Sequence, residues 1–317
     1  EMCIRDSPGL TLAAASRGQT MVVLTGGIDL SIGPMVSLTN SIASATTEKE
    51  NPRGSMVKAA LAALAVGALG GFINGALVAY GRLQPIIVTL ATGSVWTGIA
   101  LYIRPSPGGF IPPDFSNLIS GTAFQEPAVL PGGLSWGIPI PKAAFVIAGL
   151  VIFWLLFRRT PLATRIYAVG SSEGAAYLSG VNVQRTILAA YTLAGLAAGV
   201  AGLINSGQTA TGNALGGAVF TLNSIAAVVL GGAALAGGAG SFLGTLAVPL
   251  TYALARRMFG AAVGLTASTL LAVSFWGLMY SRVGIRHSLT PVLALAAFYW
   301  FLSLIHISEP TRLLSIS

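Results

Sequence analysis

The sequence predicts an all-α, polytopic integral membrane protein with about 8–10 transmembrane helices, since each crossing needs about 20 apolar residues. The 317-residue chain is 54% hydrophobic and 8% charged, and its mean hydropathy is +0.79. Long apolar runs recur along the chain and are separated by short polar segments. This composition is typical of helical membrane proteins and excludes a soluble globular domain.

In chain order, the expected spans cover residues 10–28, 31–47, 57–80, 85–103, 142–157, 186–205, 220–235, 241–255, 261–280 and 290–303. The first two spans share one apolar run with no polar loop between them. They are therefore either two short helices that meet at a break or one interrupted crossing, and the residues leave both open. Residues 1–7 and 304–317 resemble translated sequencing-adapter read-through, so we expect a single transmembrane domain at residues 8–303, truncated at its N-terminus.

The stretch TGGIDLSIG, residues 25–33, holds the acidic residue that lies inside an apolar span. An ionisable group at membrane depth costs roughly 2.5–3.5 kcal/mol, so it marks a candidate functional site. Glycines on both sides of the acid predict a helix break, which membranes tolerate only where it is buried in protein or lines a watery cavity. The candidate residues at this break are Thr25, Gly26, Gly27, Asp29, Ser31 and Gly33.

Asp29 has three interpretations. Its carboxylate could accept hydrogen bonds from solute hydroxyl groups, accept the free backbone donors of the break, or pair with a basic residue elsewhere. We favour a structural role, because a strong fixed charge hinders the release of a solute that must leave.

Glycines four residues apart, Gly67, Gly71 and Gly75, lie in one long span, and Gly195 and Gly199 repeat the spacing in another. Small residues at this spacing allow helix backbones to approach closely. Asn74 and Asn205, inside the same two spans, are expected to be interhelical hydrogen-bond partners rather than solute ligands.

The loops set the orientation. Residues 104–141 form a long proline-rich loop without a basic residue between its ends, whereas residues 158–185 are compact and basic. By the positive-inside tendency the basic loop lies on the cytoplasmic side. Counted over all the loops, this one included, basic residues are equally numerous on the two sides, so only their clustering in this short loop favours the orientation.

The stretch around the predicted break is similar to a later stretch of the chain, which indicates an internal repeat. VVLTGGIDLSIG at Val22 aligns with AVVLGGAALAGG at Ala227 at an offset of 205, and Leu-Gln-Pro at Leu83 matches Leu-Thr-Pro at Leu289 at an offset of 206. The alignment predicts two similar halves, at about residues 10–104 and 215–303, unless glycine-rich apolar helices match here by chance. The second break comprises Gly231, Gly232, Gly237 and Gly238, and Ala234 stands where the first break has its acid.

Other function classes find little support. Basic residues are scattered between apolar spans and form no stripe with aromatic residues, so we expect no nucleic-acid partner despite a net charge of +8. One cysteine and two histidines provide no disulfide, metal or cofactor site. A membrane-embedded enzyme would need paired carboxylates or a nucleophile with a base, which the spans lack.

Four stretches, in order, resemble the inner-membrane permease subunits of bacterial ABC importers of the ribose and galactose (monosaccharide) type. They are TGGIDLSIG, a stretch from Gly67 (GALGGFINGALVAYGRLQPIIVTLATGSVWTGIAL), one from Ala168 (AVGSSEGAAYLSGVNVQRTILAAYTLAGLAAGVAGLI) and one from Asn223 (NSIAAVVLGGAALAGGAGSFLGT). Beyond residue 255 the resemblance fades.

The resemblance implies a multi-pass protein of the bacterial inner membrane, in contact with membrane lipid, that transports a small polar solute and is not itself an enzyme. It implies a second permease subunit (the same chain or a close relative), a cytoplasmic ABC ATPase pair and an extracytoplasmic solute-binding protein. No glycine-rich run here ends in Gly-Lys-Ser/Thr, so the ATPase is another chain.

The resemblance also implies that residues 170–181 form the cytoplasmic segment that contacts the ATPase. A short helix should begin at Glu173, whose charge suits a helix N-terminus, and end near Gly180. The residues assigned to this coupling segment are Gly170, Glu173, Ala175, Ala176, Leu178, Ser179 and Gly180.

Two alternatives remain open. A permease for branched-chain amino acids or nucleosides would be similarly apolar. An ion-coupled secondary transporter could also use repeats and a membrane carboxylate, although such proteins carry several intramembrane charges.

Overall fold

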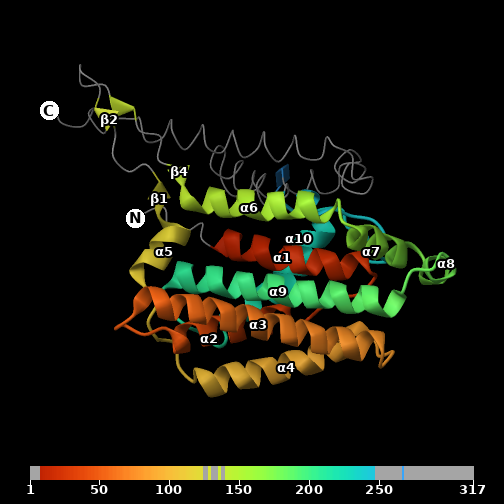
Figure 1. Ribbon diagram of the computed structural model, residues 1–317, viewed down its shortest axis with the longest axis horizontal. Coiled ribbons are helices and arrows are strands. Elements are labelled where there is room, and N and C mark those ends of the chain that lie inside the picture. Colours follow the sequence, from red (N-terminus) through yellow and green to blue (C-terminus); the bar gives the residue numbers. More distant parts are fainter. Residues whose placement is uncertain (1–7, 124–127, 130–134, 137–139, 247–265, 268–317) are drawn as a thin grey trace.

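In the computed structural model the protein is a bundle of α-helices (Figure 1). The structure describes residues 8–123, 128–129, 135–136, 140–246 and 266–267. The helices are α1 Pro8–Leu24, α2 Ile32–Thr46, α3 Pro52–Ala79, α4 Pro85–Ile103, α5 Pro113–Ser120, α6 Lys142–Phe157, α7 Pro161–Ser171, α8 Glu173–Leu178, α9 Val183–Thr209 and α10 Ala218–Leu230. The predicted all-α class is confirmed, because the strands described are two-residue pieces: β1 Thr122–Ala123, β2 Ala128–Val129, β3 Ser135–Trp136 and β4 Ile140–Pro141.

Helix α9 is central and packs against α1, α2 and α3 (Figure 1). The close backbone approach predicted from these glycines is confirmed, and it occurs between α3 and α9. A Cβ atom on Gly67 would lie 2.5 Å from the carbonyl oxygen of Gly195, and one on Gly71 would overlap the carbonyl oxygen of Tyr191. The two backbones therefore touch along these small residues, which is how membrane helices gain close packing.

Three described helices, α3, α4 and α9, are long and apolar enough to cross a membrane. A fourth crossing is possible if α6 and α7 form one span, bent by 77°. The predicted spans 85–103 and 142–157 match α4 and α6, whereas α1 and α10 end earlier than the predicted spans 10–28 and 220–235. The span 241–255 is helical from residue 242 to 246, and its remainder, with spans 261–280 and 290–303, lies outside the described residues. The total of 8–10 spans therefore stays a prediction.

The two polar loops contain short helices and strands, of which the sequence analysis anticipated only the helix that begins at Glu173. The proline-rich loop contains the short helix α5, and β1 pairs with β4 and β2 with β3, all antiparallel. The basic loop contains α7 and α8. Figure 1 shows α5 at one end of the bundle and α8 at the opposite end. Because α9 runs between these ends, its 27 residues separate them by about 40 Å.

Candidate functional site at the helix breaks

The first break begins where α1 ends in a glycine turn. Gly26 has a φ of +83°, a conformation that favours glycine. Its N–H donates to the carbonyl of Val23 at 2.9 Å, and the N–H of Gly27 donates to the carbonyl of Val22 at 3.2 Å. This pair of bonds is the Schellman motif, which stops a helix. The helix therefore ends at Leu24, before the predicted boundary at residue 28.

Asp29 belongs to a buried chain of hydrogen bonds. It is 2% exposed, and its Oδ1 atom accepts from the Ser31 backbone N–H at 2.8 Å and from the Ser31 hydroxyl at 2.6 Å. Asn74 of α3 donates through Nδ2 to the same hydroxyl at 2.7 Å. The carboxylate thus fixes the start of α2, and Ser31 links it to α3.

Two further helices satisfy the broken backbone. The N–H of Leu30 donates to the hydroxyl of Thr89, in α4, at 3.0 Å. With its amide oriented to match its neighbours, Gln19 of α1 donates to the Asp29 carbonyl at 3.0 Å and accepts from the Asp29 N–H at 3.3 Å. Buried backbone groups need such partners, so α1, α3 and α4 together hold the break in one shape.

These contacts bear on the three interpretations of Asp29. Its burial keeps it from a solute in this conformation, and within the described residues the structure shows no salt bridge to it. The contacts favour its role as acceptor for the free donors of the break. Thr25, also buried, donates its hydroxyl to the Val22 carbonyl at 2.7 Å and so helps to end α1.

Gly33 lies inside the first turn of α2 rather than at the break. A Cβ atom there would lie 2.6 Å from the Gly217 carbonyl oxygen, so this glycine allows α10 to pack against α2. An open, mainly apolar groove of about 630 Å³ lies beside it, between α4 and α10, and includes Leu30 and Pro34.

The second break repeats the first turn. Gly232 has a φ of +85°, its N–H donates to Val229 at 2.9 Å, and the N–H of Ala233 donates to Val228 at 3.1 Å. Gly26 therefore corresponds to Gly232, an offset of 206. The predicted offset of 205 is wrong by one residue, because it pairs Gly26 with Gly231, whose φ is −71°.

The corrected offset aligns Val-Val-Leu at Val22 with Val-Val-Leu at Val228, and it agrees with the offset of the Leu-X-Pro match. Asp29 then corresponds to Leu235, so the second break lacks the acid in either register. Helices α1 and α10 pack against each other. Val23 of the first turn contacts Val228 and Ala233 of the second, which places the two turns side by side.

Both breaks also meet the end of α7. The N–H of Gly238 donates to the Leu24 carbonyl at 3.0 Å. A Cβ atom on Gly237 would lie 2.7 Å from the Gly26 nitrogen and 2.9 Å from the Gly170 carbonyl oxygen, and one on Gly170 would overlap the Leu24 carbonyl oxygen. We call Gly26, Gly170, Gly237 and Gly238 the glycine junction. It joins α1, α7 and the loop after α10 with no room for side chains.

Helix α8 follows the junction directly and has the predicted limits. Its N-cap, Ser172, accepts from the Ala175 N–H, and Glu173 lies in the first turn. It ends in a third Schellman turn, in which the Gly180 N–H donates to Tyr177 at 2.9 Å and Gly180 has a φ of +79°. Ala176 is buried, whereas Tyr177 and Leu178 are 72% and 87% exposed, and Ser179 is exposed as well.

Sequence analysis missed Gln19 and Thr89, which hold the break, and Tyr191, whose hydroxyl lies close to Gly27. All three are polar groups inside apolar spans, and that is the signal that could have identified them. Asn74 makes the interhelical bond that we expected, but the side chain of Asn205 makes none within the described residues and lines a pocket instead. That part of the prediction is wrong.

In the part of the chain that the structure describes, no three His, Cys, Asp or Glu side chains gather into a potential metal site. The profile of one protein family, described as the permease component of branched-chain amino acid transport systems, matches residues 8–281. The chain belongs to this permease family.

Known relatives agree. The permease is 37% identical to the ribose import permease protein RbsC of Escherichia coli (strain K12) over 234 residues, which are 72% of this chain and 68% of that protein. It is 37% identical to the probable ABC transporter permease protein y4mJ of Sinorhizobium fredii (strain NBRC 101917 / NGR234), over 75% and 67% of the two chains. It is 34% identical to the autoinducer 2 import system permease protein LsrD of Photorhabdus temperata, over 71% and 65%. No solved structure matches this chain.

Membership establishes that the protein is an inner-membrane transport subunit of an ABC importer and not an enzyme, and that it works with an ATPase and a solute-binding protein.

Proposed function

We propose that this permease provides the membrane path for a monosaccharide in an ATP-driven importer, together with a second copy of the chain or a close relative. The observation that carries the proposal is its 37% identity to a ribose import permease. The family description names branched-chain amino acids instead. Such solutes carry an ammonium and a carboxylate group, whereas a sugar is neutral and needs hydrogen-bonding groups.

The burial and the contacts of the ionisable side chains inside the bundle favour a neutral solute. Asp29 and Arg17, the two ionisable residues of the α1 and break region, are 2% and 8% exposed. The Asp29 carboxylate accepts a hydrogen bond from the Ser31 hydroxyl, and the guanidinium of Arg17 lies 4.3 Å from the centre of the Phe153 ring. Neither charge is available to a zwitterionic solute in this conformation.

We assign α8 to the contact with the ATPase. The supporting observation is its position at one end of the bundle, with Tyr177 and Leu178 exposed, since an exposed pair of large apolar side chains is typical of an interaction site. The glycine junction would transmit a movement of α8 to both helix breaks, because close-packed backbones shift as a unit. The solute-binding protein would then dock at the opposite end, near α5.

The test is uptake of radiolabelled D-ribose by membrane vesicles that contain the chain with its partner ATPase and solute-binding protein. We expect uptake that requires ATP and persists when the proton gradient is collapsed, with excess unlabelled D-ribose competing and excess leucine not competing. Uptake that stops with the proton gradient would identify an ion-coupled transporter, and competition by leucine would identify an amino acid permease.

A further inference from the structure

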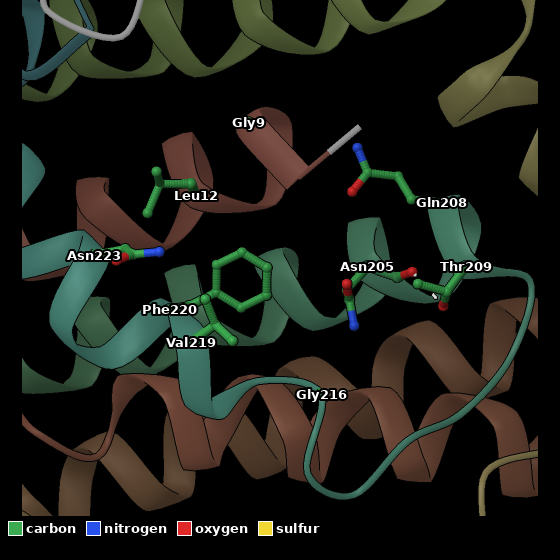
Figure 2. A pocket seen from close by; sticks show the side chains of 9 residues that line it. All are labelled: Gly9, Leu12, Asn205, Gln208, Thr209, Gly216, Val219, Phe220 and Asn223. Carbon is green, nitrogen blue, oxygen red and sulfur yellow. Dashed lines mark hydrogen bonds between the residues drawn. The ribbon is translucent and has the colours of Figure 1, made fainter. Parts of the chain in front are cut away.

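A second cavity lies at the end of the bundle away from α8, between α1, α9 and α10 (Figure 2). Its volume is about 330 Å³, within the range of about 300–1,000 Å³ that is usual for small-molecule sites. It includes none of the residues of either break. The side chains that matter are Asn205, Gln208 and Thr209 of α9, Phe220 and Asn223 of α10, and Leu12 of α1.

The amides of this cavity are not used by the protein. Within the described residues, the side chains of Asn205 and Asn223 make no hydrogen bond, and the amide nitrogen of Gln208 donates none. Only Gln208 Oε1 is engaged, by the Thr11 hydroxyl at 2.6 Å. Asn205 is 8% exposed, and buried amides normally find a partner, as Asn40 and Asn74 do. An amide held at such a position without a partner is available to a ligand.

The cavity also offers an apolar surface. Figure 2 shows the Phe220 ring standing between Asn223 on one side and Asn205 and Gln208 on the other. Carboxamides both donate and accept hydrogen bonds, and an aromatic face packs against C–H groups. None of the lining residues is charged. This combination suits a neutral molecule that carries several hydroxyl groups around an apolar face.

The loop beside the cavity is held in place from α2. Asn40 accepts from the Asn213 N–H at 2.6 Å and donates to the Thr211 carbonyl at 3.2 Å, and Ser37 accepts from the Gly217 N–H at 2.9 Å. The wall formed by the start of α10 is therefore fixed before a ligand arrives, which lowers the entropy lost on binding.

We propose that this cavity is an outer binding station on the solute path and takes a neutral, polyhydroxylated molecule of monosaccharide size. The inference rests on the proposed function. Asn205 and α8 lie toward opposite ends of α9, which is about 40 Å long, so the cavity opens on the side opposite the proposed ATPase contact. Asn205 and Asn223 hydrogen-bond the hydroxyl groups, and Phe220 covers the apolar face.

Cysteine protection tests the station in the complete transporter. Cys3 is the only cysteine of the permease chain, so Cys3→Ser provides a permease free of thiols, and labelling is read on this chain alone. Val219→Cys in this background is treated with a membrane-impermeant methanethiosulfonate, with and without D-ribose, because Val219 lines the cavity and is exposed. The control is Leu118→Cys, which is exposed at the same end of the bundle but lies outside the cavity.

We expect D-ribose to slow labelling of the Val219→Cys thiol about tenfold and to leave the labelling of the Leu118→Cys thiol unchanged. Adding Asn205→Leu should abolish the protection. Protection of both thiols, or of neither, would contradict the proposed binding site, as would a Val219→Cys thiol that never reacts. If the unmodified transporter takes up D-ribose in these cases, the proposed function stands and only the station fails.

Discussion

The backbone N–H of Gly238 donates a 3.0 Å hydrogen bond to the carbonyl oxygen of Leu24, the last residue of α1. This bond joins the end of the first helix to the loop that follows α10. The free carbonyl groups at a helix C-terminus need partners, and here one partner comes from the other break. The two breaks therefore form one structural unit, to which Gly170 attaches α7.

Gly170→Ala tests whether this junction is needed for transport. The added Cβ atom would overlap the Leu24 carbonyl oxygen, and overpacking of this kind costs about 1–3 kcal/mol. We expect sugar uptake to fall about tenfold or more, with a smaller fall in membrane abundance. Gly149→Ala is the control, because a Cβ atom there meets no atom within 4 Å. Equal uptake by both variants would show that the junction has no mechanical role.

The sequence predicts the two helix breaks but does not predict that they contact each other. Glycines beside an acid in an apolar run indicate an interrupted helix. The limits of α4 and α6 follow from the ends of their apolar runs, and those of α8 follow from Glu173 and Gly180. The contact of Gly170 with Leu24 depends on the packing of distant segments, for which one sequence carries no local signal. The repeat register was missed by one residue for a related reason. Which glycine adopts a positive φ is settled by hydrogen bonds to the preceding turn, not by composition.

Asp29 variants separate a structural role from a role of charge. Asp29→Asn keeps an oxygen that can accept from Ser31, so we expect its thermal unfolding to stay close to that of the parent. Asp29→Ala leaves the buried Ser31 N–H without its acceptor, which costs about 1–3 kcal/mol. The thermal unfolding temperatures of the detergent-purified proteins measure this loss of stability. Identical unfolding temperatures for the two variants would contradict the structural role of the carboxylate.

Gly71→Val tests the contact of α3 with α9. The larger side chain would collide with the Tyr191 carbonyl oxygen and with Gly195, and the helices would have to separate. We expect a loss of about 1–3 kcal/mol or more, seen as a lower unfolding temperature and poor recovery of folded protein. Gly98→Val in α4 is the control, since a Cβ atom there meets nothing within 4 Å. A loss of stability for both variants alike would indicate an effect of valine itself.

Asn205 shows what pattern reasoning cannot settle. Polar residues inside apolar spans are expected to bond to neighbouring helices, and Asn74 does so through Ser31. Asn205 has the same kind of sequence surroundings, yet α10 begins beside it in a way that leaves a cavity rather than a partner. The difference arises from the loop before α10, which Asn40 holds, and so from tertiary structure alone.

Leu178→Ser tests the assignment of α8 to the ATPase. Leu178 is 87% exposed, so its replacement should leave the fold of the permease unchanged. If the side chain is buried against the ATPase, its loss removes about 1.5–3 kcal/mol of burial, and co-purification of the ATPase should fall about tenfold or more. Leu118→Ser is the matched control, because Leu118 is 57% exposed in α5, at the opposite end of the bundle. ATPase binding that is lost in the Leu118 variant and kept in the Leu178 variant would reverse the proposed orientation, because the ATPase would then dock at the α5 end.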